Sequence, residues 1–174
     1  MKADEAGRTM AEAAVQGRGV FRDAEEKEQY VSFIIEKEFY GVDILKVQEI
    51  VGMTKITSVP SMAAYMKGVI NLRGKVVPVV DMRMKFRMPE RAYDMTTVIL
   101  IVSVKGREVG MIVDSVSDVI DIPREKIQDT QHFKASIEAE FIIGIGNVDD
   151  NLIILLDVDR ILSADELEHI DKNQ

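Results

Sequence analysis

The 174-residue sequence contains no cysteine and no tryptophan, and aromatic residues make up only 6% of it. The absence of cysteine excludes disulfides, thiolate zinc sites and a cysteine nucleophile. The scarcity of aromatic side chains argues against a platform on which nucleic-acid bases stack. A net charge of -8 also disfavours non-specific binding to nucleic acid and to an anionic membrane surface.

Long apolar runs are missing as well. The longest, at residues 98–102 and 152–156, have the length of strands and are far too short to cross a bilayer. The start of the chain is polar and acidic and lacks the apolar region of a signal peptide. We therefore expect a cytoplasmic protein with no direct insertion into a membrane.

Motifs for catalysis are also absent from the sequence. Its two histidines, His132 and His169, do not stand at metal-ligand spacing, and no GxSxG, P-loop or HExxH motif occurs. The aspartates between residues 149 and 159 lack EF-hand spacing and suit an ordinary hairpin turn. The sequence thus predicts a protein that is not an enzyme and that holds no metal and no cofactor.

One segment of the chain occurs twice. Residues 68–81 align without a gap with residues 144–157, and a glycine, an asparagine and an aspartate fall at matching positions. Each copy has the pattern of a strand, a tight polar turn, a second apolar strand and a capping aspartate. A weaker match, between residues 41–50 and 110–119, precedes the two copies. These matches indicate an internally duplicated all-β unit with a groove between its two copies.

About ten short strands with tight turns predict an all-β fold with short helices, built as two tandem five-stranded β-barrels of the SH3 or OB type. Residues 1–27 have little to bury and are predicted to be a flexible N-terminal extension. The expected subdomains are residues 28–93 and residues 94–174. The second includes a C-terminal helix that starts at a capping box of Ser163 and Glu166.

The turn at residues 71–74 carries one candidate binding residue. Gly74 permits a positive φ and Asn71 can bond to its own backbone, which are structural roles. Arg73 is not required by a hairpin, and its guanidinium fork suits a partner's carboxylate or amide. The alternative is an arginine that is merely solvated. The second copy has Asp149 at this place, so the charge is reversed.

Two further features suit a protein partner. If Val47, Glu49 and Val51 share one strand face, a charge lies between two apolar residues, which fits a binding surface better than a core; the alternative is a short helix with Glu49 in solvent. Phe133 is a lone large apolar residue in a polar loop at residues 128–136. It either plugs its own barrel or anchors a protein contact.

Three segments together resemble the CheW family of chemotaxis coupling proteins: residues 40–50 (YGVDILKVQEI), 68–83 (GVINLRGKVVPVVDMR) and 109–114 (VGMIVD). The similarity covers about residues 29–170 and implies two five-stranded barrels. It also implies a non-enzymatic adaptor, recruited to membrane receptor arrays. Such an adaptor joins the regulatory domain of the CheA histidine kinase to the cytoplasmic tips of chemoreceptors, the methyl-accepting chemotaxis proteins.

The resemblance also assigns candidate binding residues. In this family the receptor contacts lie near the groove between the barrels, and they fall here on Val47, Glu49, Asn71, Arg73 and Val119. Phe133 falls in the loop where the family makes a contact with the kinase domain.

Two other interpretations stay open at this point. The chain could be the coupling protein of a chemosensory system that does not control flagella. It could also be an oligonucleotide-binding β-barrel, although its net charge of -8 and sparse aromatic residues oppose this.

Overall fold

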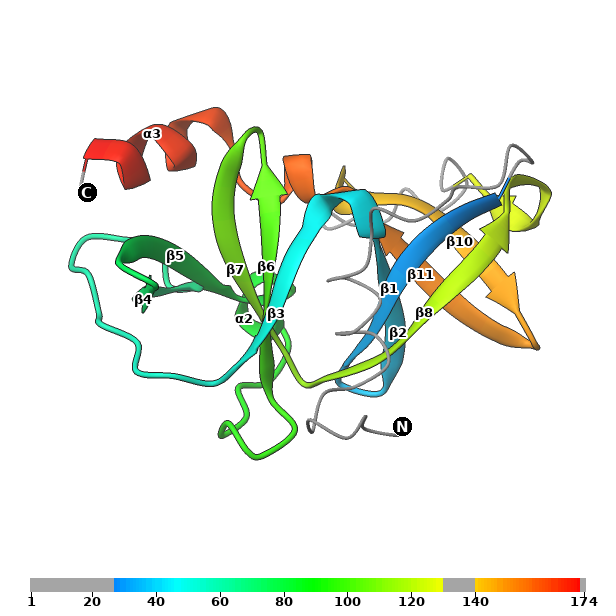
Figure 1. Ribbon diagram of the computed structural model, residues 1–174, viewed down its shortest axis with the longest axis horizontal. Coiled ribbons are helices and arrows are strands. Elements are labelled where there is room, and N and C mark those ends of the chain that lie inside the picture. The colour runs from blue at the N-terminus through cyan, green and yellow to red at the C-terminus, as the bar shows by residue number, and fades with distance from the viewer. Residues whose placement is uncertain (1–26, 130–139, 173–174) are drawn as a thin grey trace.

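The computed structural model describes residues 27–129 and 140–172, and it consists of two β-sheets that lie side by side (Figure 1). Short helices connect some of the strands, and one longer helix ends the described chain. The all-β fold class with short helices and a C-terminal helix is therefore confirmed. Residue 27 already belongs to the first strand, while the rest of the predicted extension, residues 1–26, lies outside the described residues, as does Phe133.

The strands are β1 (Lys27–Ile35), β2 (Glu38–Asp43), β3 (Val47–Gly52), β4 (Met66–Leu72), β5 (Lys75–Asp81), β6 (Val98–Val104), β7 (Arg107–Val113), β8 (Ser115–Pro123), β9 (Ile127–Gln128), β10 (Ile142–Val148) and β11 (Asn151–Leu156). The helices are η1 (Ile44–Lys46), α2 (Met82–Lys85), η2 (Arg124–Lys126), η5 (Val158–Arg160) and α3 (Ala164–Lys172). No helix in this part of the chain is long and apolar enough to cross a membrane.

Each sheet takes strands from both halves of the chain. The six-stranded sheet has the order β8-β1-β2-β11-β10-β9, and the five-stranded sheet has the order β3-β6-β7-β5-β4. The expected division into residues 28–93 and 94–174 is therefore not the division between the sheets. Strand β3 leaves the first hairpin and pairs with β6, and β8 leaves the second hairpin and pairs with β1.

The short connections explain this exchange. Strands β2 and β3 are joined only by η1, whose N-cap Asp43 accepts a hydrogen bond from the Leu45 N–H at 2.9 Å. Between β7 and β8 there is only Asp114. In both places the two successive strands belong to different sheets: β2 and β3, and β7 and β8. The chain therefore crosses between the sheets at these two connections (Figure 1).

The duplicated segments occupy equivalent places in the two sheets. They form the hairpins β4–β5 and β10–β11, and each hairpin has a register shift at its matching glycine, Gly68 or Gly144. Each second strand then pairs in parallel with the end of another hairpin: β5 with β7, and β11 with β2. The repeat read from the sequence thus corresponds to one repeated arrangement of strands.

Three clusters of buried apolar side chains hold this arrangement together. One lies within the five-stranded sheet around Ile70 and Ile101, and another within the six-stranded sheet around Tyr30 and Leu155. The largest cluster contains residues of both sheets, such as Phe33 of β1, and also reaches α3. Because this cluster spans the two sheets, burial of apolar surface fixes their mutual position.

Candidate functional site

Glu49 and Arg73 form a bidentate ion pair at the rim of the five-stranded sheet. Arg73 Nη1 donates to Glu49 Oε1 at 2.7 Å, and Nη2 donates to Oε2 at 2.5 Å. Glu49 lies on β3 and Arg73 in the β4–β5 turn, and β3 and β4 are the two edge strands of this sheet. The sheet must therefore curl until its edges approach each other, as a barrel does.

A backbone bridge supports the same closure. Thr57, in the connection between β3 and β4, exchanges two hydrogen bonds of 2.8 Å with Val69 of β4. The approach is close at Gly68, where an added Cβ would lie 2.0 Å from the Thr57 carbonyl oxygen, and its φ is +141°. Only glycine fits such a conformation and such a contact without strain.

The ion pair affects the ionisation of both side chains. The hydrogen bond from Arg73 lowers the pKa of Glu49 in spite of partial burial, and Glu49 raises the pKa of Arg73. The Glu49 side chain is 24% exposed, whereas that of Arg73 is 70% exposed. Since a guanidinium has five N–H donors, Arg73 can hold Glu49 and still donate to a partner.

The turn that carries Arg73 has the conformation expected of a tight hairpin. Arg73 and Gly74 have φ angles of 51° and 86°, as in a type I′ turn. The Asn71 side chain accepts a hydrogen bond from the Gly74 N–H at 2.8 Å, so its predicted bond to the turn backbone is confirmed. Arg73 has a positive φ, a conformation that glycine adopts more readily. A residue other than glycine in this conformation is a candidate for a functional role.

The remaining candidates do not all join this surface. Val47 is fully buried, because a register shift between it and Glu49 turns the two side chains to different environments. The structure thus places Val47 in the core and corrects the expectation that it faces a partner. Val119 is half-buried on β8 of the other sheet, where it packs against the largest core cluster. The kinase candidate Phe133 lies outside the described residues.

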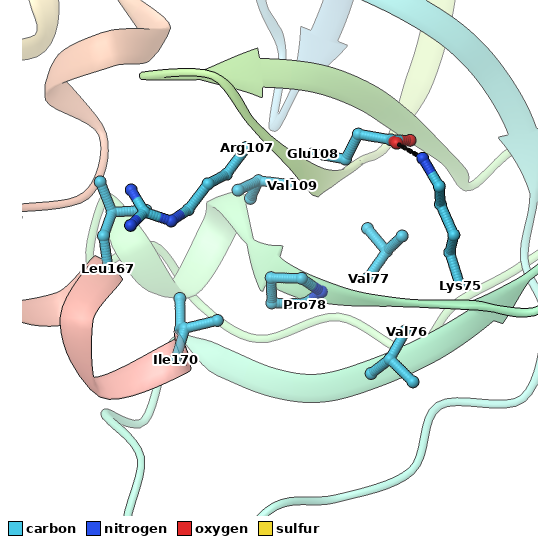
Figure 2. Close-up of a pocket in the computed structure, with 9 residues that line it drawn as sticks. All are labelled: Lys75, Val76, Val77, Pro78, Arg107, Glu108, Val109, Leu167 and Ile170. Carbon is cyan, nitrogen blue, oxygen red and sulfur yellow. Dashed lines mark hydrogen bonds and ion pairs between the residues drawn. The ribbon is translucent and has the colours of Figure 1, made fainter. Parts of the chain in front are cut away.

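A small cleft lies beyond the Arg73 turn, between β5, β7 and α3. Its volume is about 350 Å³, and it is lined by apolar side chains such as Pro78 and Ile170 (Figure 2). At its rim Lys75 forms an ion pair of 2.8 Å with Glu108. Val76, next to Lys75, is 53% exposed. Both apolar and charged side chains therefore line the surface between the candidate turn and the C-terminal helix.

A buried ionic network, which sequence reasoning missed, joins the two sheets. Arg83 of α2 donates to both carboxylate oxygens of Asp114, from Nε at 2.8 Å and from Nη2 at 2.7 Å. Its Nη1 contacts Glu36 at 2.6 Å and the Pro89 carbonyl oxygen at 2.9 Å. Asp114 is the crossover residue between β7 and β8, and no pattern in the sequence links it to Arg83, 31 positions away.

Hydrogen bonds and nearby positive charges favour the ionised form of Asp114. Burial alone would raise its pKa, but hydrogen bonds from Arg83 and from the Glu36 N–H, together with the positive charges of Arg83 and Arg91, outweigh burial and lower the pKa. The carboxylate therefore stays ionised and holds the β1–β2 turn, α2 and the crossover together.

The other crossover has an ion pair of opposite polarity. Lys46 of η1 contacts Asp159 at 3.0 Å, and Asp159 is the counterpart of Arg83 in the repeat. Asp159 also accepts a hydrogen bond from the Lys105 N–H at 2.9 Å. Each crossover is thus held by an ion pair, with the signs exchanged between the copies.

Groups that could hold a metal ion are not found within residues 27–129 and 140–172. The exposed chemistry at the candidate surface consists of one guanidinium, one carboxylate and one amide. These groups can bind a polar partner by hydrogen bonds, and the surface has no nucleophile beside a base.

Comparison with known proteins assigns the chain to a family. The model of the CheW-like domain matches residues 29–166. The chemotaxis protein CheW of Klebsiella aerogenes is 37% identical over 144 residues, which cover 83% of this chain and 87% of that protein. The probable chemotaxis protein CheW of Rhizobium etli is 35% identical over 140 residues, covering 80% and 90%. The crystal structure of the scaffolding protein TtCheW from Thermoanaerobacter tengcongensis matches with a TM-score of 0.74 and 32% identity, over 80% of this chain and 94% of that one.

Proposed function

The chain belongs to the CheW-like domain family, and we propose that it is a chemotaxis scaffold that couples chemoreceptors to the CheA histidine kinase. Its partners are then the cytoplasmic tips of the receptors and the regulatory domain of the kinase, and it is recruited to membrane receptor arrays. The observation that carries the proposal is the match of fold and sequence over most of the chain. Such a scaffold acts without catalysis, by contacting the signalling states of its partners differently.

Receptor binding is assigned to the surface formed by Glu49, Asn71 and Arg73. Three features support it: the exposed guanidinium, the carboxylate that orients it, and the tight turn that carries Arg73 and accepts support from the Asn71 side chain at the end of β4. Preorganisation of this kind reduces the entropy lost on binding. Val119, on the other sheet, is kept as a secondary contact of the same interface, and Phe133 as a contact with the kinase.

Co-sedimentation with a receptor cytoplasmic fragment and the CheA regulatory domain tests the coupling. We expect a ternary assembly with the wild-type chain. Arg73→Glu should weaken receptor binding by about tenfold or more, the loss expected for a charge-assisted contact near the centre of an interface. Lys126→Glu is the matched control, because it reverses an exposed charge in η2, which joins β8 and β9 of the other sheet. No association of the folded chain with either partner would contradict the proposal.

The double variant Glu49→Arg with Arg73→Glu separates two roles of the ion pair. It can restore a pair within the chain but presents a carboxylate, not a guanidinium, to the receptor. We therefore expect it to recover thermal stability relative to the single variants without recovering receptor binding. Full recovery of receptor binding would show that the pair only shapes the turn and that Arg73 does not touch the receptor.

A further inference from the structure

The two repeated hairpins can be compared position by position, because each pairs with its neighbouring strand in the same register. Val79 of β5 lies opposite Gly110 of β7, and their counterparts in the repeat, Leu155 of β11 and Gly41 of β2, also lie opposite each other. Val79 and Leu155 belong to the interior clusters of their own sheets. Since successive side chains of a strand point to opposite faces, the residues that alternate with them form an equivalent outer face in each copy.

In the first copy the C-terminal helix covers this outer face. Pro78 of β5 is buried, and it lines the small cleft of Figure 2 together with Leu167 and Ile170, two buried residues of α3. Arg107 of β7 lines the same cleft, and its side chain points towards Leu167 (Figure 2). The helix has four acidic residues and one lysine. An acidic amphipathic helix therefore rests on a face that carries an arginine.

The equivalent face of the second copy is apolar and more open. Figure 1 shows that α3 lies over the five-stranded sheet, away from β10 and β11. Ile154, the counterpart of the buried proline, is only half-buried, and so is Ile145, its partner on β10. Leu152, on the same face of β11, is 60% exposed. Further along this face Tyr40 of β2 is buried, and its ring stacks on that of Phe86 at 5.6 Å, so the open part ends there.

The charges around this face are the reverse of those in the first copy. Glu38 of β2, the counterpart of Arg107, is exposed and lies next to Leu152, because the parallel pairing of β2 with β11 brings the starts of both strands together. The two aspartates of the β10–β11 turn, at residues 149–150, are exposed as well. The adjoining β1–β2 turn adds one glutamate and one lysine, which offset each other. An apolar centre with an acidic edge is complementary to an apolar helix face flanked by basic side chains.

We propose that the outer face of β10 and β11 is a docking site for a basic amphipathic helix of a protein partner. Aliphatic side chains three or four positions apart on that helix pack against Ile145, Leu152 and Ile154, as α3 packs on the first copy. A lysine or arginine beside them pairs with Glu38. The α3 helix of a second copy is acidic and does not match this edge. None of the residues assigned above to receptor or kinase binding lies on this face, so the docking site does not depend on the proposed function.

Three peptides of about fifteen residues, near the length at which an alanine-rich helix becomes stable in water, test the proposal. The first is built from alanine and lysine, with leucines spaced so that they share one helix face. The second has glutamate in place of every lysine, and the third has the composition of the first with its leucines spread around the helix. In NMR titrations of the 15N-labelled full chain, we expect the first peptide to shift the amide signals of β10, β11 and the start of β2. The other two should bind about tenfold more weakly.

Variants of the chain locate the contact. Leu152→Lys removes the apolar contact and repels the lysines, so it should weaken binding of the first peptide by about tenfold, as for the loss of one leucine buried at an interface. Val76→Lys, at the equivalent and similarly exposed place in the first copy, is the matched control and should leave the affinity unchanged. Glu38→Gln should weaken binding by about two- to fivefold, as for the loss of one exposed ion pair. Glu168→Gln, at an exposed site on α3, should have no effect.

Several results would overturn the proposal. With the wild-type chain alone, they are failure of the first peptide to shift the signals of β10 and β11, or equally tight binding of either of the other peptides. With the variants, they are an unchanged affinity of folded Leu152→Lys for the first peptide, or an equal loss in Val76→Lys. A wild-type chain that sediments as a dimer, and as a monomer after Leu152→Lys, would show that a second copy covers this face in place of a partner's helix.

Discussion

Replacing Asp114 by asparagine should destabilise the fold more than removing the charge of an exposed side chain. The Asp114 and Arg83 side chains are only 11% and 10% exposed, and Asp114 accepts three short hydrogen bonds, two from Arg83 and one from the Glu36 N–H at 2.9 Å. Asparagine keeps the shape but offers one acceptor and turns an N–H₂ group towards one of these donors. The buried guanidinium of Arg83 then loses its best counter-charge.

Breaking a buried ion pair by removing one partner costs about 3–5 kcal/mol. Arg83 would keep its contact with Glu36 at 2.6 Å and with the Pro89 carbonyl oxygen, which places the loss at the lower end, about 3 kcal/mol. For a chain of this size that corresponds to a fall in Tm of about 6–12 °C.

Urea unfolding followed by circular dichroism measures the loss of stability. Asp121→Asn, which removes the same charge from an exposed site on β8, is the control and should change stability by less than about 0.5 kcal/mol. Because the pKa of Asp114 is lowered in the folded chain, its contribution is complete above the ordinary value of 3.8 and is lost as the pH falls through the lowered pKa. The difference in unfolding free energy between wild type and Asp114→Asn should therefore disappear in acid. Equal losses of stability in Asp114→Asn and Asp121→Asn would contradict the conclusion that burial makes the Asp114–Arg83 pair important.

Two further substitutions test the local structure. Gly68→Ala should destabilise the chain by about 3 kcal/mol, since its Cβ would overlap the Thr57 carbonyl oxygen. Gly74→Ala, with open space around the site, should destabilise it by only about 1 kcal/mol. Similar losses of stability for the two variants in thermal unfolding would contradict this reasoning. Ser163→Ala removes the hydroxyl that accepts a hydrogen bond from the Glu166 N–H at 3.1 Å and should destabilise the chain by about 1 kcal/mol. Amide hydrogen exchange should become faster in α3 alone. Unchanged exchange in α3 would show that packing alone holds the helix.

The duplication was readable in the sequence because each copy needs the same local chemistry. A glycine at the register shift, a tight polar turn and a capping aspartate recur in β4–β5 and in β10–β11. The partition of strands between the sheets was not readable. Both copies have the same pattern whether β3 pairs within its own half or with β6, so the strand order had to come from the structure.

The candidate site was predicted in part. A charged residue on β3 and an arginine in the β4–β5 turn were both singled out, but nothing in their spacing showed that Glu49 and Arg73 bind each other. The alternation that placed Val47 on the same face failed because a register shift between Val47 and Glu49 interrupts it. Lys85 carried no signal either, since the rings that its ammonium group contacts, Tyr65 and Phe141, lie far from it in the chain.

The sequence by itself determined the properties that depend on neighbouring residues: the β-class of the chain, its hairpin turns, the helix caps at Asp43 and Ser163, and the motifs that mark its family. Only the tertiary structure decided which strands share a sheet and which charges meet. The reason is physical. Turns and caps are formed by backbone groups a few positions apart, whereas the Arg83–Asp114 and Glu49–Arg73 pairs exist only after the common core has brought distant segments together.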